Sequence, residues 1–237
     1  DWVLTGEKTS ISMADQADWA VVFARTGTVE ARAHGISAFL VDMRSPGIST
    51  TRFADLGQHA IGRGSIFFDG VRVPAGHMLG KEGSGFVQVM QGFDFSRALI
   101  GLQCLSVARV SLQETWRYVQ ERKAFGKPLS DNQGVTFPLA EAETMVEAAR
   151  LLCFKTLAAK DAGLPHTKEA AMCKWWPPKL AYEVVNTCLL LHGHAGYDVG
   201  LPFEQRLRDV LGLQIGDGTA QIMKLIIARE ALRAAAA

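Results

Sequence analysis

The chain has 237 residues, of which 48% are hydrophobic, and its formal net charge is +1. A chain of this length can bury a full core and hold one large domain or two small ones. The balanced charge excludes a broad basic surface for nucleic acid, and the apolar runs stop short of the ~20 residues that span a bilayer, so we expect neither nucleic acid nor a membrane as partner.

The first third of the chain has the pattern of antiparallel β-strands. Val71 and Val73 alternate with Arg72, as in a strand with one buried face, and Pro74 then ends the run. Turn-forming residues such as the Ser-Pro-Gly at residues 45–47 separate the runs. The predicted strands cover residues 19–23, 36–41, 48–53 and 65–73.

After Gly80 the spacing of apolar residues becomes that of helices. Leu105, Leu112 and Val119 fall near one face of a long helix, which Gly126 ends. Further helices are predicted over residues 132–162, from Pro165 toward residue 191, around Pro202, and over residues 219–236.

Two prolines fall inside the third predicted helix. Because Pro177 and Pro178 lack an amide hydrogen, we expect that helix to bend or break there. The tail at residues 234–237 is expected to fray.

The two patterns together predict an α+β protein. An antiparallel β domain over residues 1–79 precedes an all-α domain of four-helix-bundle type over residues 80–237. The cysteines lie in helical stretches without CxxC spacing, which indicates buried free thiols in a reducing compartment. They are Cys104, Cys153, Cys173 and Cys188.

Five motifs, in this order along the chain, resemble those of the acyl-CoA dehydrogenase family. Phe-Phe-Asp-Gly-Val-Arg-Val-Pro at residues 67–74 is similar to the strand that closes the family's middle β domain. Glu-Arg-Lys-Ala-Phe-Gly-Lys-Pro at residues 121–128 resembles the end of its first long helix. Residues 192–197 and 206–209 resemble its glycine-rich turn and the Arg-Asp helix, and residues 215–222 its catalytic loop. The resemblance covers nearly the whole chain, but the family's N-terminal helical domain is missing, so we interpret the chain as a fragment.

The resemblance implies a flavin-dependent α,β-dehydrogenation of an acyl-CoA thioester. A carboxylate removes the α-proton while the β-hydride passes to FAD, and because the α C–H is a weak acid, the base must be desolvated and the thioester carbonyl polarised. Asp217 occupies the position of the base, and Gly216 and Gly218 beside it are expected at the substrate. Read without the motif, Gly-Asp-Gly-Thr before an apolar helix is an ordinary turn and N-cap.

Two departures from the family pattern point to a wide acyl group. Most members carry glutamate where Asp217 lies and a bulky aromatic residue where Gly216 lies, so the shorter pair leaves room near the reacting carbons. Bacterial cyclohexanecarboxyl-CoA dehydrogenases resemble this combination, which suggests an alicyclic acyl-CoA as substrate. Some members place their base on the first long helix, but the residue there is Ser96, which cannot serve.

Phe93, Asp94 and Arg97 match positions that bind the CoA moiety, and arginine suits phosphate and polar anchoring. The alternative is an ordinary helix surface with an ion pair. Trp175 and Trp176 are expected in the core or at a subunit interface rather than in the acyl pocket.

The resemblance also assigns residues to FAD. Ser10 stands where the family has a stacking aromatic residue, and Leu190 and His194 replace a glutamine and a glycine of the glycine-rich turn. Some positions match residues that reach the FAD of a neighbouring subunit, which implies a dimer or a dimer of dimers. The residues expected at the FAD are Ser10, Ile11, Ser12, Gly193, Thr219 and Gln221, with Arg122, Phe125 and Gln133 reaching across the interface.

By the same resemblance, an electron-transfer flavoprotein is the expected electron acceptor, and the cytoplasm of a bacterium the expected location. Two alternatives stay open: a flavoenzyme similar to nitroalkane oxidases, which also use aspartate as base, and a flavoprotein subunit without catalytic activity. His192 and His194 have no cysteine or carboxylate partner in sequence, so a structural role is expected rather than metal binding.

Overall fold

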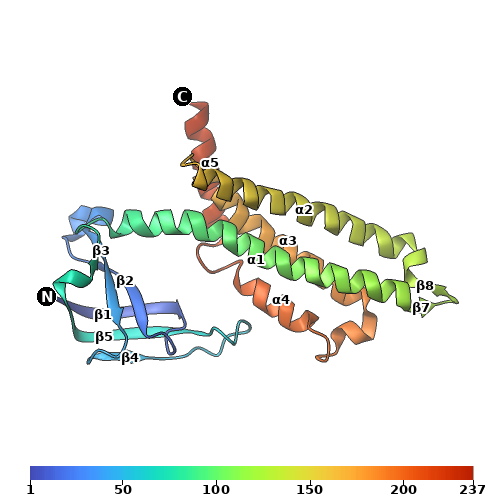
Figure 1. Ribbon diagram of the computed structural model, residues 1–237, viewed down its shortest axis with the longest axis horizontal. Coiled ribbons are helices and arrows are strands. Elements are labelled where there is room, and N and C mark those ends of the chain that lie inside the picture. Colours follow the sequence, from blue (N-terminus) through green and yellow to red (C-terminus); the bar gives the residue numbers. More distant parts are fainter. Residues whose placement is uncertain (237) are drawn as a thin grey trace. The chain divides into compact units, whose positions relative to one another are not determined.

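The computed structural model describes residues 1–236 and divides into two compact units, Asp1–Gly92 and a second that begins at Phe93 (Figure 1). Helix α1 (Gly85–Glu121) contributes its first turns to the first unit and the remainder to the second. The β part and the helical part predicted from the sequence are thereby confirmed.

The first unit holds two three-stranded sheets in which every pair of neighbouring strands is antiparallel. The sheet orders are β1-β5-β4 and β2-β3-β6. Two short 3₁₀ helices, Val29–Gly35 and Ala75–His77, were not predicted. The strands are β1 (Trp2–Ser12), β2 (Trp19–Arg25), β3 (Ile36–Asp42), β4 (Ile48–Thr50), β5 (Arg63–Val73) and β6 (Met78–Leu79).

Apolar residues from both sheets form one core. Val71 and Val73 of β5 are buried while Arg72 is exposed, as their alternation predicted. They belong to one apolar cluster with Phe39 of β3, against which Trp2 packs edge-on with ring centroids 5.4 Å apart. Burial of one face of each sheet therefore fixes the register of the strands.

The second unit is helical, with a short hairpin, β7 (Lys123–Ala124) and β8 (Lys127–Pro128), after the first helix. Helix α3 packs against α2, α4 and α5 and also contacts α1. All four cysteines lie buried as free thiols, as predicted. The helices are α1, α2 (Gln133–Asp161), α3 (Thr167–Leu191), α4 (Phe203–Gly212) and α5 (Ala220–Ala235), with 3₁₀ turns at Leu129–Asp131 and Gly193–Tyr197.

Helix α3 runs without interruption through Pro177 and Pro178, so of the expected bend or break, the break is wrong. Both prolines are buried, and tertiary packing around α3 outweighs the loss of two backbone hydrogen bonds. Of the tail expected to fray, Ala234 and Ala235 are helical, and Ala237 lies outside the described residues.

Helix α1 is more apolar than expected. Within the described residues it alone is long and apolar enough to cross a membrane, with a mean hydropathy of 1.2 over an 18-residue window. Inside the protein, however, Leu105, Leu112 and Val119 of α1 are fully buried in the helical core, as in the central helix of a bundle.

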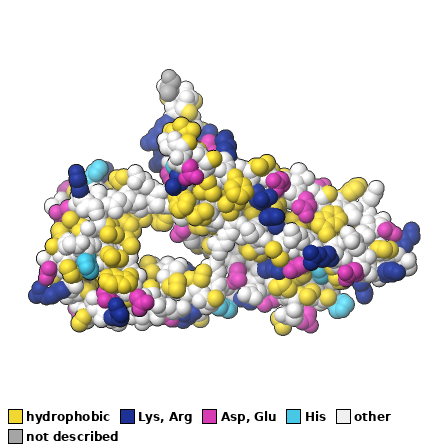
Figure 2. All heavy atoms as spheres, in the orientation of Figure 1, with side chains coloured by type: hydrophobic (Ala, Val, Ile, Leu, Met, Phe, Trp, Pro, Cys, Tyr) yellow, Lys and Arg dark blue, Asp and Glu magenta, His cyan; other side chains and the backbone are white. Residues whose placement is uncertain are grey.

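On the face that Figure 2 shows, basic and acidic side chains are mixed rather than gathered into a field of one sign.

Candidate functional site

Asp217 lies in the turn between α4 and α5. The N–H groups of Gln214, Ile215 and Gly216 close successive turns on carbonyls of the preceding turn, whereas the N–H of Asp217 meets no acceptor among the described residues. The backbone of Asp217 is left-handed, with φ of 55°. Left-handed non-glycine residues are uncommon and tend to gather at functional sites.

The turn ends in a helix cap. Thr219 is the N-cap of α5, and its Oγ1 accepts a hydrogen bond from the N–H of Ile222 at 3.5 Å. Thr219 is therefore confirmed as the helix N-cap that a Gly-Asp-Gly-Thr turn predicts. This capping role does not conflict with a catalytic role for Asp217. Asp217 itself is exposed, so nothing in the described chain supplies the desolvation that we expected around the base.

The two glycines beside Asp217 differ in what surrounds them. A Cβ on Gly218, whose φ is 105°, would lie 2.6 Å from Cε of the buried Met223. Only glycine fits there without movement of that side chain. A Cβ on Gly216 would meet nothing closer than the carbonyl oxygen of Gly212 at 3.8 Å, an ordinary van der Waals contact, so the chain leaves room for a Cβ that glycine does not fill.

The predicted CoA-binding residues of α1 contact one another, and of the three Arg97 is buried while Phe93 and Asp94 are partly exposed. Arg97 donates to Asp94 at 2.9 Å, and its guanidinium lies over the ring of Phe93, 5.5 Å from the centroid. Thr167, at the start of α3, donates to the other oxygen of Asp94 at 2.6 Å. The Arg97 side chain is only 6% exposed, and its buried Nε has no hydrogen-bond partner. An unsatisfied buried N–H is costly, and it marks a place where an acceptor from outside the chain would be stabilised.

Sequence reasoning missed Lys174 of α3, whose amine is within electrostatic range of Arg97. The Lys174 side chain is fully buried, and Nζ donates to the carbonyl of Leu213 at 2.5 Å. Burial lowers the pKa of Lys174; Cys104 and Asp217 act to raise it, and Arg97 acts to lower it. The signal in the sequence is a single lysine within the apolar run Ala-Ala-Met-Cys-Lys-Trp-Trp at residues 170–176.

The residues predicted beside the flavin ring lie at the end of β1 in the first unit. Ser10 is left-handed, with φ of 58°, in an irregular stretch of pairing with β5 between Lys8 and Ile11. Its Oγ accepts from Arg63 at 3.3 Å, whereas the exposed Ser12 meets no side-chain partner among the described residues. Ile11 packs partly into the β core.

The residues predicted to reach a neighbouring subunit lie at or next to the β7–β8 hairpin. Phe125, at its tip, is 105% exposed and left-handed, with φ of 52°. Arg122 and Gln133 on either side are also exposed. Within residues 1–236 these three side chains are therefore open to solvent.

In the glycine-rich turn, His192 is structural. It is buried, stacks on Tyr118 with ring centroids 4.1 Å apart, and its Nδ1 lies 2.8 Å from the Cys188 carbonyl oxygen. The described residues hold no cluster of histidine, cysteine or carboxylate side chains that could bind a metal ion. Gly193 is exposed with φ of 59°, and Gln221 is exposed in the first turn of α5.

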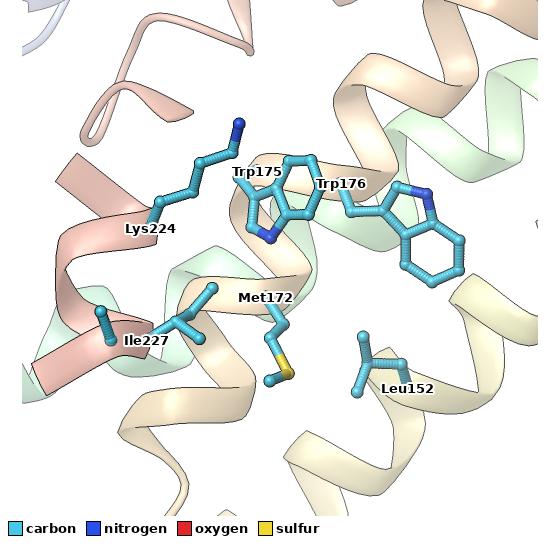
Figure 3. Close-up of a pocket in the computed structure, with 7 residues that line it drawn as sticks. Leu152, Met172, Trp175, Trp176, Lys224 and Ile227 are labelled. Carbon is cyan, nitrogen blue, oxygen red and sulfur yellow. The ribbon is translucent and has the colours of Figure 1, made fainter. Parts of the chain in front are cut away.

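Trp175 and Trp176 line an open apolar hollow of about 470 Å³ between α2, α3 and α5 (Figure 3). The Nζ of Lys224 lies 4.7 Å from the ring centroid of Trp175. Because the hollow lies on one side of α3 and is lined by neither Asp217 nor Arg97, it is separate from the predicted catalytic residues.

Two family models match the chain. The C-terminal domain of acyl-CoA dehydrogenases matches residues 83–232, and the middle domain matches residues 1–71. The chain belongs to the acyl-CoA dehydrogenase family. The two matched ranges agree with the helical and β parts of this family member.

The relatives agree on the family but differ in substrate. Cyclohexane-1-carbonyl-CoA dehydrogenase of Geobacter metallireducens is 36% identical over all of this chain and 62% of its own length. The mitochondrial short-chain specific acyl-CoA dehydrogenase of Mus musculus is 37% identical over 98% of this chain and 56% of its own length. A chain in a structure of the electron-transferring flavoprotein of Acidaminococcus fermentans is 34% identical with a TM-score of 0.94, and the match covers 98% of this chain and 61% of that one. The chain thus spans less than two thirds of the length of each of these relatives.

The second unit therefore contains both the predicted base and the predicted CoA-binding residues, and Asp217 and Arg97 both influence the pKa of the buried Lys174. The residues predicted at the flavin ring belong to the first unit.

Proposed function

We propose that this acyl-CoA dehydrogenase family member catalyses the α,β-dehydrogenation of an acyl-CoA thioester with Asp217 as the base. The observation that carries the proposal is the position of Asp217, an exposed carboxylate in a left-handed turn before α5 that interacts electrostatically with buried Lys174. A carboxylate oxygen of Asp217 accepts the α-proton of the substrate. The unpaired N–H of Asp217 is available to polarise the thioester carbonyl, which stabilises the negative charge that develops there.

Arg97 anchors the CoA part of the substrate in this proposal. Its unsatisfied Nε, buried beside Phe93, offers a charged donor to a carbonyl or phosphate oxygen. Asp94 keeps the guanidinium in place through an ion pair that Thr167 supports.

In this proposal, FAD is bound through hydroxyl and backbone groups rather than through ring stacking. Ser12 offers an exposed hydroxyl at the end of β1, with Ser10 and Ile11 before it, and Gly193, Thr219 and Gln221 supply polar groups in the second unit. FAD supplies, when bound, the acceptor for the β-hydride. Arg122, Phe125 and Gln133 extend to the FAD of a second copy, which gives a dimer or a homotetramer; the full exposure of Phe125 supports this assignment.

The acyl group is proposed to be bulky or alicyclic, such as cyclohexanecarboxyl. The open space at Gly216 and the short aspartate side chain support this substrate. The similarity to cyclohexane-1-carbonyl-CoA dehydrogenase adds to it, although the similarity to a short-chain enzyme is equally strong. An electron-transfer flavoprotein is the proposed electron acceptor, and the bacterial cytoplasm the proposed location.

The test is the absorbance spectrum of the purified protein, followed by identification of the flavin released on denaturation. Stoichiometric FAD that is bleached by an acyl-CoA without oxygen supports the proposal, and faster bleaching by cyclohexanecarboxyl-CoA than by butyryl-CoA supports the alicyclic substrate. Rapid oxidation of the reduced flavin by air would instead favour the nitroalkane-oxidase-like alternative. A protein that holds FAD but is bleached by no acyl-CoA would be the subunit without catalytic activity.

A further inference from the structure

We propose that Lys174 is a positioning residue for catalysis, because it holds the catalytic turn (residues 213–219) by the carbonyl of Leu213. The proposal rests on the proposed role of Asp217. Lys174 itself touches neither substrate nor cofactor and acts through the backbone that carries the base.

Burial of Lys174 costs solvation energy, and no ion pair within the described residues offsets this cost. Lys174 has no exposed surface, and its Nζ makes one hydrogen bond within the described residues, to Leu213. Most buried lysines are paired with a carboxylate, since an ammonium group loses much of its solvation energy on burial. No such ion pair forms within residues 1–236, so a salt bridge in the described core does not explain the lysine.

The acceptor of the Lys174 hydrogen bond lies at the end of a helix. Leu213 is the C-cap of α4, and the last carbonyls of a helix lack partners inside that helix. A cation at this end also interacts favourably with the helix dipole. Lys174 therefore caps α4 from a neighbouring helix, 39 residues away in sequence.

The turn between Leu213 and Asp217 has few other anchors. Within the described residues, the N–H groups of residues 213–216 bond only to carbonyls of residues 210–212 at the end of α4, and the N–H of Asp217 has no acceptor. At the far end the turn is fixed by α5, through the Thr219 cap and the close approach of Gly218 to Met223. The hydrogen bond from Lys174 fixes the near end, so its loss would leave the left-handed Asp217 held from one side.

The electrostatic surroundings of Lys174 agree with this position. Asp217 acts to raise the pKa of Lys174 and Arg97 acts to lower it, so both charged groups are close enough to act on its amine. Whether the amine is charged or neutral, it keeps an N–H to donate to Leu213, so the anchoring role does not depend on its protonation state.

The test compares amide hydrogen exchange along the whole chain in Lys174→Met and in Lys179→Met. Lys179 is the matched control, because it lies on the same helix and makes an exposed pair with Glu183. We expect exchange in residues 213–219 to rise at least about tenfold in Lys174→Met, with little change in the interior of α1 and α2, and no change in Lys179→Met. Exchange that rises equally throughout the second unit, or not at all in the turn, would overturn the proposal.

A second variant keeps the test decisive if Lys174→Met folds poorly. Lys174→Arg retains a long donor, so we expect it to restore much of the protection of the turn. The same loss of protection in Lys174→Arg as in Lys174→Met would count against an anchoring hydrogen bond.

In the FAD-loaded enzyme, the turnover number of Lys174→Met should fall by about tenfold or more, with KM within about threefold of wild type, and Lys174→Arg should recover part of it. The exchange experiment needs no substrate. An exchange difference in a protein that oxidises no acyl-CoA would refute the proposed function alone, whereas an active enzyme with an unaltered turn would refute the role of Lys174 alone.

Discussion

Gly101 of α1 lies directly against the carbonyl oxygen of Cys173 in α3. A Cβ at position 101 would come within 2.8 Å of that oxygen and within 2.8 Å of Sγ of Cys153. Four residues after Cys173 comes Pro177, which has no N–H to give that carbonyl its usual helical bond. Because Gly101 has no side chain, the backbone of α1 can approach α3 closely there. It packs against the Cys173 carbonyl, which is the place where α3 lacks a helical hydrogen bond.

Replacing Gly101 with alanine should destabilise the helical unit by roughly 2 kcal/mol or more, because the new methyl group meets a backbone oxygen that cannot move independently. Urea unfolding measures the loss. Gly92→Ala is the control on the same helix, since a Cβ there meets nothing within 4 Å, and it should be neutral or stabilising. Equal effects of the two substitutions would contradict the close approach.

The ion pair between Arg206 and Glu114 should contribute to stability in a pH-dependent way. Hydrogen bonds from Arg206 lower the pKa of Glu114 below its ordinary value of 4.5, and partial burial opposes them. A lowered pKa in the folded state means that the stabilisation is fully present above the unfolded value and is lost as the pH falls through the folded value.

At pH 7, Glu114→Gln should therefore lower the free energy of unfolding by roughly 1 kcal/mol, a modest effect because solvent screens this partly exposed pair. The difference from wild type should shrink steadily as the pH falls below 4.5. Glu121→Gln, at the exposed end of the same helix, serves as control and should show no such trend. A difference that stayed constant down to acid pH would argue against the ion pair.

Arg97 should control substrate binding more than turnover. Because lysine lacks the planar donors of the guanidinium, Arg97→Lys should raise KM for the acyl-CoA about tenfold or more and leave the turnover number within about threefold. Arg150→Lys is a close match, since Arg150 also pairs with a residue one turn earlier and lies over an aromatic ring. Steady-state kinetics give KM and the turnover number of both variants. An unchanged KM in Arg97→Lys would show that Arg97 does not bind the substrate.

Local patterns explain most of the fold features that could be predicted from the sequence. The alternation at Val71 and Val73 reports which face of β5 is buried, and helices α2, α3 and α5 begin and end within a residue or two of the predicted limits. Strand β4 is shorter than the predicted 48–53, although Phe53 still donates its N–H to Arg63 at 2.7 Å. Where prediction failed, as at Pro177, the missing information was the packing of a distant helix.

The candidate site was harder to predict from the sequence, for the same reason. The motif around Asp217 is local, so the resemblance found it, whereas the bond between Lys174 and Leu213 joins two helices and leaves no short pattern. The exposure of Asp217 was also unexpected, because desolvation of a base depends on what covers the turn and not on the turn's own sequence.

The central claim is that Asp217 removes the α-proton, and the most direct test is the reductive half-reaction of Asp217→Asn. The FAD-loaded variant is mixed without oxygen with an acyl-CoA that bleaches the wild type, and the visible flavin band is followed over time. Because Asp217 is exposed, the free energy of unfolding should change by less than about 0.5 kcal/mol, and Asp161→Asn, at another exposed aspartate, should react like wild type. We predict that bleaching slows by about a thousandfold or more in Asp217→Asn; a rate within about twofold of wild type would show that Asp217 is not the base.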